Sequence, residues 1–106
     1  MVIKNFHPKR SEQIAFTVTF SGAVDFTSFE VAAKKSYSDT TYSIYRNLGN
    51  GITKISDTTY QITIPTSNLD YTTYIYDARV ILDSVAYFPF SGKIVVGPSV
   101  YEVYNG

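Results

Sequence analysis

The sequence predicts an all-β protein built as an antiparallel β-sandwich of seven or eight strands. The chain holds ten Tyr and seven Phe residues but no Trp, and this balance, with many Thr, Val and Ile, favours strands over helices. Several short segments alternate large apolar and polar residues with a period of two, and turn residues separate them at the intervals expected of a sandwich. No segment shows a helical period over three turns.

The first half of the chain carries four predicted strands, at residues 14–20, 29–34, 42–46 and 52–56. The first is the clearest, because its large side chains fall on every second position and therefore on one face. The second alternates apolar residues with Glu30 and Lys34, so it should be half exposed. Glycines and asparagines crowd into residues 47–51, which indicates a tight loop before the fourth strand.

The second half carries four more, at residues 60–64, 73–81, 85–90 and 93–96. Pro65 ends the first of these because it has no N–H to donate. In the longest strand one parity carries Asp77 and Arg79, so the core candidates are on the other parity: Tyr74, Tyr76, Ala78 and Val80. Asp83 and Ser84 predict a hairpin turn, and we interpret Ser91-Gly92 as a lead into the last strand.

At 106 residues the chain has room for one domain. We place the sandwich at about residues 12–97, with an N-terminal arm at 1–11 and a C-terminal tail at 98–106. Apolar residues in such ends suggest contact with a strand edge or with another subunit. The predicted protein interface is therefore formed by Phe6, Lys9, Arg10, Val100, Tyr101, Val103 and Tyr104.

Charge and composition exclude several partners. Nine basic and nine acidic residues cancel and are scattered, so we expect neither nucleic acid nor a membrane surface as a partner. There is no cysteine for a disulfide or a thiolate site. The N-terminus lacks the apolar block of a signal peptide, so we expect a soluble chain made in a cytoplasm.

No motif for catalysis emerges. His7 is the only histidine, and one imidazole without a cysteine or a second histidine is poorly equipped for zinc or a triad. The aspartates at 25, 39, 57, 70 and 83 fall where aspartate stabilises a turn, and no spacing resembles a calcium loop. We therefore expect no catalytic residue, cofactor or metal ligand.

Asp77 and Arg79 lie two apart on one strand face and allow two interpretations. One is an ion pair or cross-strand contact on the solvated side. The other is a partly buried carboxylate that holds a loop in place.

Tyrosine gives the only positive indication of binding, because a phenol joins a large apolar face to a polar tip. Seven tyrosines lie in or beside predicted loops and the tail, at positions 37, 42, 45, 71, 87, 101 and 104. They either fill the core and strand faces or form a contact surface.

In order, residues 14–20, 29–34, 49–52, 60–64, 74–80 and 92–96 resemble small virion domains of tailed phages. The similarity is to the immunoglobulin-like sandwich of baseplate upper proteins and of head-fibre or decoration proteins. Its more specific marks are Tyr76-Asp77 and the turn at 49–52. The glycine that usually precedes the Tyr-x-Tyr-Asp strand is replaced by Tyr71-Thr-Thr73.

The resemblance implies an immunoglobulin-like fold and a non-enzymatic structural protein of a virion that is assembled in the host cytoplasm. It would act in capsid decoration or head-fibre attachment, as a homo-oligomer in contact with capsid, fibre or tail subunits. Three alternatives remain: a tail or baseplate structural or adhesion module, a carbohydrate-binding module that uses exposed tyrosines, and a small hydrolase.

Overall fold

The computed structural model describes residues 2–98, which form an all-β structure without helices. Nine strands follow one another along the chain: β1 (Val2–Ile3), β2 (Ile14–Thr19), β3 (Ser28–Lys34), β4 (Ile44–Leu48), β5 (Gly51–Lys54), β6 (Thr59–Ile64), β7 (Thr73–Leu82), β8 (Val85–Tyr87) and β9 (Phe90–Val95). No helix in this part of the chain is long and apolar enough to span a membrane.

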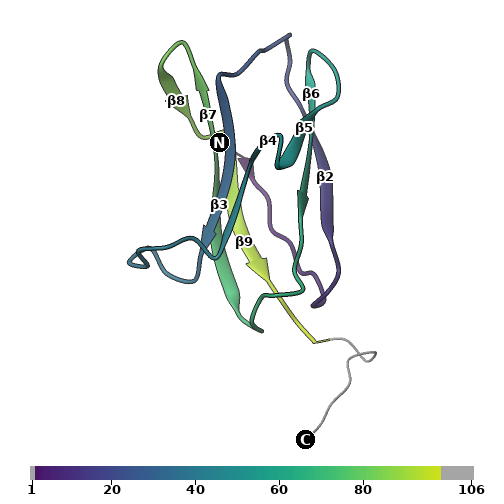
Figure 1. The fold of residues 1–106 in the computed structure, drawn as a ribbon, viewed down its shortest axis with the longest axis vertical. Coiled ribbons are helices and arrows are strands. Elements are labelled where there is room, and N and C mark those ends of the chain that lie inside the picture. The colour runs from purple at the N-terminus through teal and green to yellow at the C-terminus, as the bar shows by residue number, and fades with distance from the viewer. Residues whose placement is uncertain (1, 99–106) are drawn as a thin grey trace, which may run out of the picture.

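The strands form one mixed sheet that curls into a half-barrel. Its order is β1-β9-β7-β3-β4-β5-β6-β2, and β8 pairs with β7 as a hairpin. Two antiparallel halves face each other across the core, one made of β9, β7, β3 and β4 and the other of β5, β6 and β2 (Figure 1). Two strand pairs are parallel, β1 with β9 and β4 with β5. The sheet is therefore mixed, whereas the sequence predicted an antiparallel arrangement.

The core follows the predicted alternation. Phe29, Val31 and Ala33 of β3 are buried, and Val80, Ala78 and Tyr76 lie directly opposite on β7. All four core candidates of the longest strand are buried, which confirms their parity. Burial stabilises the fold by roughly 1.5–3 kcal/mol for each large side chain. At one end of the core Phe20, Phe26, Phe29 and Tyr60 pack ring against ring.

The N-terminal arm lies along β9. The sequence suggested that it contacts a strand edge or another subunit, and the structure shows contact with a strand edge. Its backbone alternately donates to and accepts from β9, with Lys4 N–H on the Ser91 carbonyl at 2.8 Å and Phe6 N–H on the Lys93 carbonyl at 2.9 Å. The Tyr76 hydroxyl donates to the Lys4 carbonyl at 2.5 Å. Burial raises the pKa of this tyrosine to about 12, because the ionised phenolate would lose its hydration.

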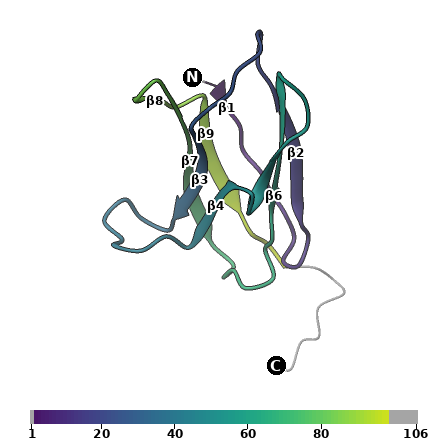
Figure 2. The same ribbon diagram turned by 45° about the horizontal axis from the view of Figure 1, so that its top comes forward.

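Phe6 faces inward from the arm and crosses the gap between the two ends of the sheet. Its ring centroid is 4.9 Å from that of Phe16 on β2 and 6.1 Å from that of Tyr76 on β7. Figure 2 shows the arm running between β9 and β2. Phe6 therefore joins the core and closes the seam of the half-barrel, which is the gap between β9 and β2.

Two predicted turns are confirmed by their backbone angles. Gly49 and Gly51 have φ of 86° and 99°, which glycine adopts without a Cβ clash, and this turn carries the chain from β4 to β5. Asp83 and Ser84 have φ of 52° and 66°, as in the tight turns that suit a hairpin.

Ser91-Gly92 was expected to lead into the last strand, but both residues lie inside β9. A Cβ on Gly92 would be 2.2 Å from the Lys4 carbonyl oxygen. The glycine is thus a point of close backbone approach, where the arm packs onto the strand.

Candidate functional site

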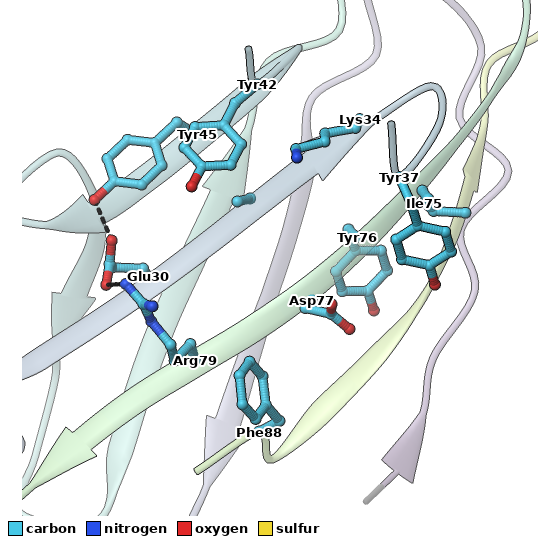
Figure 3. A pocket seen from close by; sticks show the side chains of 11 residues that line it. Glu30, Lys34, Tyr37, Tyr42, Tyr45, Ile75, Tyr76, Asp77, Arg79 and Phe88 are labelled. Carbon is cyan, nitrogen blue, oxygen red and sulfur yellow. Dashed lines mark hydrogen bonds and ion pairs between the residues drawn. The ribbon is translucent and has the colours of Figure 1, made fainter. Parts of the chain in front are cut away.

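A groove lies over the outer face of β3 and β7, on the side away from the core (Figure 3). Because side chains alternate along a strand, β3 turns Ser28, Glu30, Ala32 and Lys34 outward while Phe29, Val31 and Ala33 enter the core, and the last three outward residues form the groove floor. The register places Arg79, Asp77 and Ile75 of β7 directly opposite Glu30, Ala32 and Lys34, respectively. The floor of the groove therefore has Ala32 and Asp77 at its centre, the Glu30–Arg79 pair at one end, and Lys34 and Ile75 at the other.

Aromatic side chains rise around this floor, and we call the whole feature the aromatic groove. Tyr45 comes from β4, Tyr42 from the segment before it, Tyr37 from the β3–β4 loop and Phe88 from the segment between β8 and β9. Tyr37 is 80% exposed and Phe88 is 50% exposed. The groove has a volume of about 210 Å³.

Tyr42 and Tyr45 form one wall of the aromatic groove. Their ring centroids are 5.5 Å apart and their planes differ by 17°, so the rings are stacked. The Lys34 ammonium lies 5.6 Å from the centroid of Tyr42, within the range of a cation–π contact. The wall is held at several points and presents a fixed surface to the groove.

Glu30 joins this wall to the floor. Its carboxylate accepts hydrogen bonds from the Tyr45 hydroxyl, from Arg79 Nη2 at 2.6 Å and from the Ser28 hydroxyl at 3.2 Å. The bond from Tyr45, followed by that from Arg79, holds the pKa of Glu30 below its usual value of 4.5. The same contact with Glu30 raises the pKa of Tyr45, and pairing with Glu30 raises that of Arg79.

The Glu30 network does not suit Glu30 to general acid catalysis at neutral pH. A general acid at neutral pH needs a raised carboxyl pKa, whereas three donors stabilise the ionised form of Glu30. Within residues 2–98 no group of three or more His, Cys, Asp or Glu side chains is placed to hold a metal ion. The arrangement offers rings for stacking, carboxylate acceptors and cationic donors.

The structure distinguishes between the two interpretations of Asp77 and Arg79. Arg79 makes a cross-strand ion pair with Glu30 on the outer face. Asp77 is exposed in the aromatic groove, so the interpretation as a partly buried carboxylate is wrong. Of the turn aspartates, Asp25 and Asp70 form ion pairs with Lys54 and Lys35.

The predicted interface residues fall into three groups. Phe6 is half-buried and packs inward, as described above. Lys9 and Arg10 lie at the end of the molecule where β9 ends. Lys9 forms an isolated parallel β-bridge with Gly97, and Arg10 N–H donates to the Gly97 carbonyl at 2.8 Å. The others, Val100, Tyr101, Val103 and Tyr104, lie outside the described residues.

Arg10 is held against a tyrosine that the sequence also singled out. Its guanidinium carbon is 5.3 Å from the ring centroid of Tyr71, and Nε donates to the Ser67 carbonyl at 3.4 Å. Tyr71 is 47% exposed. We call Lys9, Arg10, Tyr71 and Gly97 the docking end.

The sequence singled out Tyr37, Tyr42, Tyr45, Asp77 and Arg79 separately, but Glu30, Lys34 and Phe88 were missed as members of one site. The signal for Glu30 and Lys34 was present, because both fall on the outward parity of β3. What was missing was the pairing of β3 with β7, which joins positions such as 30 and 79.

Comparison with known proteins adds no relative to this description: no family model matches the chain, and no curated protein matches it.

Proposed function

We propose that this chain is a non-enzymatic structural protein of a tailed-phage virion, acting in capsid decoration or head-fibre attachment through protein–protein contacts. Two arguments support the proposal: the resemblance to phage virion domains, and the docking end. The docking end is the observation that carries it, because Arg10, a predicted contact residue, lies there over the ring of an exposed tyrosine.

The docking end has the chemistry of a protein contact. The Arg10 guanidinium lies over the ring of the half-exposed Tyr71, and Arg and Tyr are two of the three residue types enriched in binding hot spots. Lys9 is exposed beside them. Gly97, which pairs with Lys9, lies at this same end, next to Pro98, the last described residue.

The proposed partners are capsid, fibre or tail subunits and further copies of this chain, with assembly in the host cytoplasm and no contact with nucleic acid or membrane. A tail or baseplate adhesion module would use the same docking end on a different part of the particle. The carbohydrate alternative depends on the aromatic groove instead, which is a different surface.

We further infer that the half-barrel is an open variant of the immunoglobulin-like sandwich. The two facing antiparallel halves and their single shared core support this inference. The strand order also supports it, because β5-β6-β2 corresponds to the D-E-B order of an immunoglobulin domain and β4-β3-β7-β9 to the C′-C-F-G order. Two features differ from the constant-type domain. The first strand, β1, pairs with β9 rather than with β2, and β4 pairs with β5, which joins the two halves into one sheet.

The test is co-sedimentation of the full chain with purified particles from the host that produces it, together with cross-linking of intact particles. We expect the chain in the particles, with cross-links from Lys9 to a capsid, fibre or tail protein. Arg10→Ala, Tyr71→Ala and a chain ending at residue 98 should each reduce co-sedimentation by about tenfold or more.

Circular dichroism would establish that each variant is folded. Tyr87→Ala is the matched control, because this tyrosine is 52% exposed but lies on β8, outside the docking end. Absence of the chain from purified particles would contradict the virion role. Equal co-sedimentation of all variants would remove the docking end from the proposal.

A further inference from the structure

We propose that the aromatic groove binds one neutral pyranose unit of a glycan. This inference goes beyond the virion role and does not depend on it, because the groove and the docking end are formed by different residues.

The position of the groove decides how a ligand is recognised. It lies over the middle of the sheet, where β3 pairs with β4 and β7, and β7 pairs with β3 and β9. The backbone groups of these strands are therefore engaged within the sheet, and an extended peptide could not add to it as a further strand. Recognition must come from side chains.

The side chains suit a molecule with one apolar face and many hydroxyl groups. Tyr37 and Phe88 are exposed rings that border the groove, and ring faces of this kind pack against the C–H face of a pyranose. Ala32 and Ile75 add apolar surface to the floor, beside the carboxylate of Asp77. A lining of aromatic and apolar side chains with a few polar groups is typical of a small-ligand site.

The charges favour a neutral ligand. Glu30 and Asp77 contribute two negative charges, and Lys34 and Arg79 contribute two positive charges, so the lining has no net charge. Carboxylates accept from hydroxyl groups, and ammonium or guanidinium groups donate to hydroxyl oxygens. A phosphate or a carboxylated sugar would gain from the two cations but would meet two carboxylates.

The site is also formed before any ligand arrives. Glu30 is fixed by Ser28, Tyr45 and Arg79. The stacked pair of Tyr42 and Tyr45 holds the facing wall. Ordering of these groups is therefore not a cost of binding. The volume of about 210 Å³ is below the range of drug-sized pockets, roughly 300–1,000 Å³, and suits a single sugar unit.

The test is NMR titration of the isotope-labelled full chain with glucose, galactose, mannose, N-acetylglucosamine, and β-1,4-linked tetramers of glucose and N-acetylglucosamine. We expect at least one neutral sugar to shift the amide signals of Ala32, Ile75 and Asp77, with a dissociation constant on the order of 1 mM. N-acetylneuraminic acid, which is anionic, should bind more weakly.

Phe88→Ala and Tyr37→Ala should each weaken binding about tenfold. Tyr87→Ala is again the matched control and should change it less than about twofold, because Tyr87 is similarly exposed but does not line the groove. All three variants should co-sediment with particles like the unmodified chain, which separates this proposal from the virion role.

Absence of shifts at the groove with every sugar would overturn the proposal. So would equal loss of binding in Tyr87→Ala, since the sugar would then sit elsewhere. Protection of the groove amides by the particle, with no effect of sugar, would assign the groove to a protein partner and would likewise overturn it.

Discussion

Glu30 illustrates how one side chain connects three elements of this fold. It lies on β3 and accepts bonds from Tyr45 on β4 and Arg79 on β7. The side chain of Glu30 is 17% exposed and that of Arg79 is 47% exposed, so water screens the pair only partly. The sequence could not predict this contact, because Glu30 and Arg79 are 49 positions apart.

We expect Glu30→Gln to lower the free energy of unfolding by about 1 kcal/mol at neutral pH. Folding favours the ionised form because the folded-state pKa of Glu30 is below 4.5. Its contribution is present above the unfolded-state pKa and is lost as the pH falls through the lowered folded-state value. Urea unfolding at about pH 7 and about pH 3 would measure this, and the difference between variant and parent should shrink in acid.

The matched control is Asp70→Asn, which removes the ion pair with Lys35 on a more exposed part of the surface. It should have a smaller effect at neutral pH than Glu30→Gln. An effect of Glu30→Gln that is no larger than that of Asp70→Asn would show that the Glu30 network does not stabilise the fold.

Among the elements, the arm and β9 depend on each other. The arm supplies β9 with a parallel neighbour from Val2 to Lys9, and Gly92 allows the two backbones to approach. Asn5 adds a side-chain bond, since its Oδ1 accepts from Lys93 N–H at 2.9 Å. The tertiary contact explains why a glycine is placed inside a strand.

We expect Gly92→Ala to displace the arm and to lower the free energy of unfolding by about 2 kcal/mol, since its Cβ would meet the Lys4 carbonyl at 2.2 Å. Amide exchange would be the measurement, with faster exchange at Lys4 and Phe6, whose N–H groups bond to β9. Gly22→Ala is the control, because no atom lies within 4 Å of a Cβ there. Unchanged exchange at both amides in Gly92→Ala would contradict the close approach.

For the molecule as a whole, the decisive feature is the seam between β9 and β2. Among residues 2–98 the sheet does not close by strand pairing, because β2 pairs only with β6 and the arm pairs only with β9. Side chains close the seam instead. The ring of Phe6 packs against that of Phe16, and the ring centroids of Phe16 and Phe90 are 5.8 Å apart. Contacts between aromatic rings thus hold the two edges together where no strand pair forms.

We expect Phe6→Ala to lower the free energy of unfolding by about 2 kcal/mol, because it removes a half-buried ring from the seam. Phe88→Ala, the control, removes an exposed ring and should change it by about 0.5 kcal/mol or less. Denaturant unfolding would measure both. Equal effects of the two variants would mean that Phe6 does not close the seam.

By itself the sequence determined the all-β class, most strand positions, the core parity of β7 and the two tight turns. These features depend on local chemistry: alternation sets which face is buried, and residues that tolerate positive φ set the turns. Only the tertiary structure decided the strand order, the place of the arm and the aromatic groove. Each of these depends on which strands pair, and pairs such as Glu30 with Arg79 join residues that no local pattern connects.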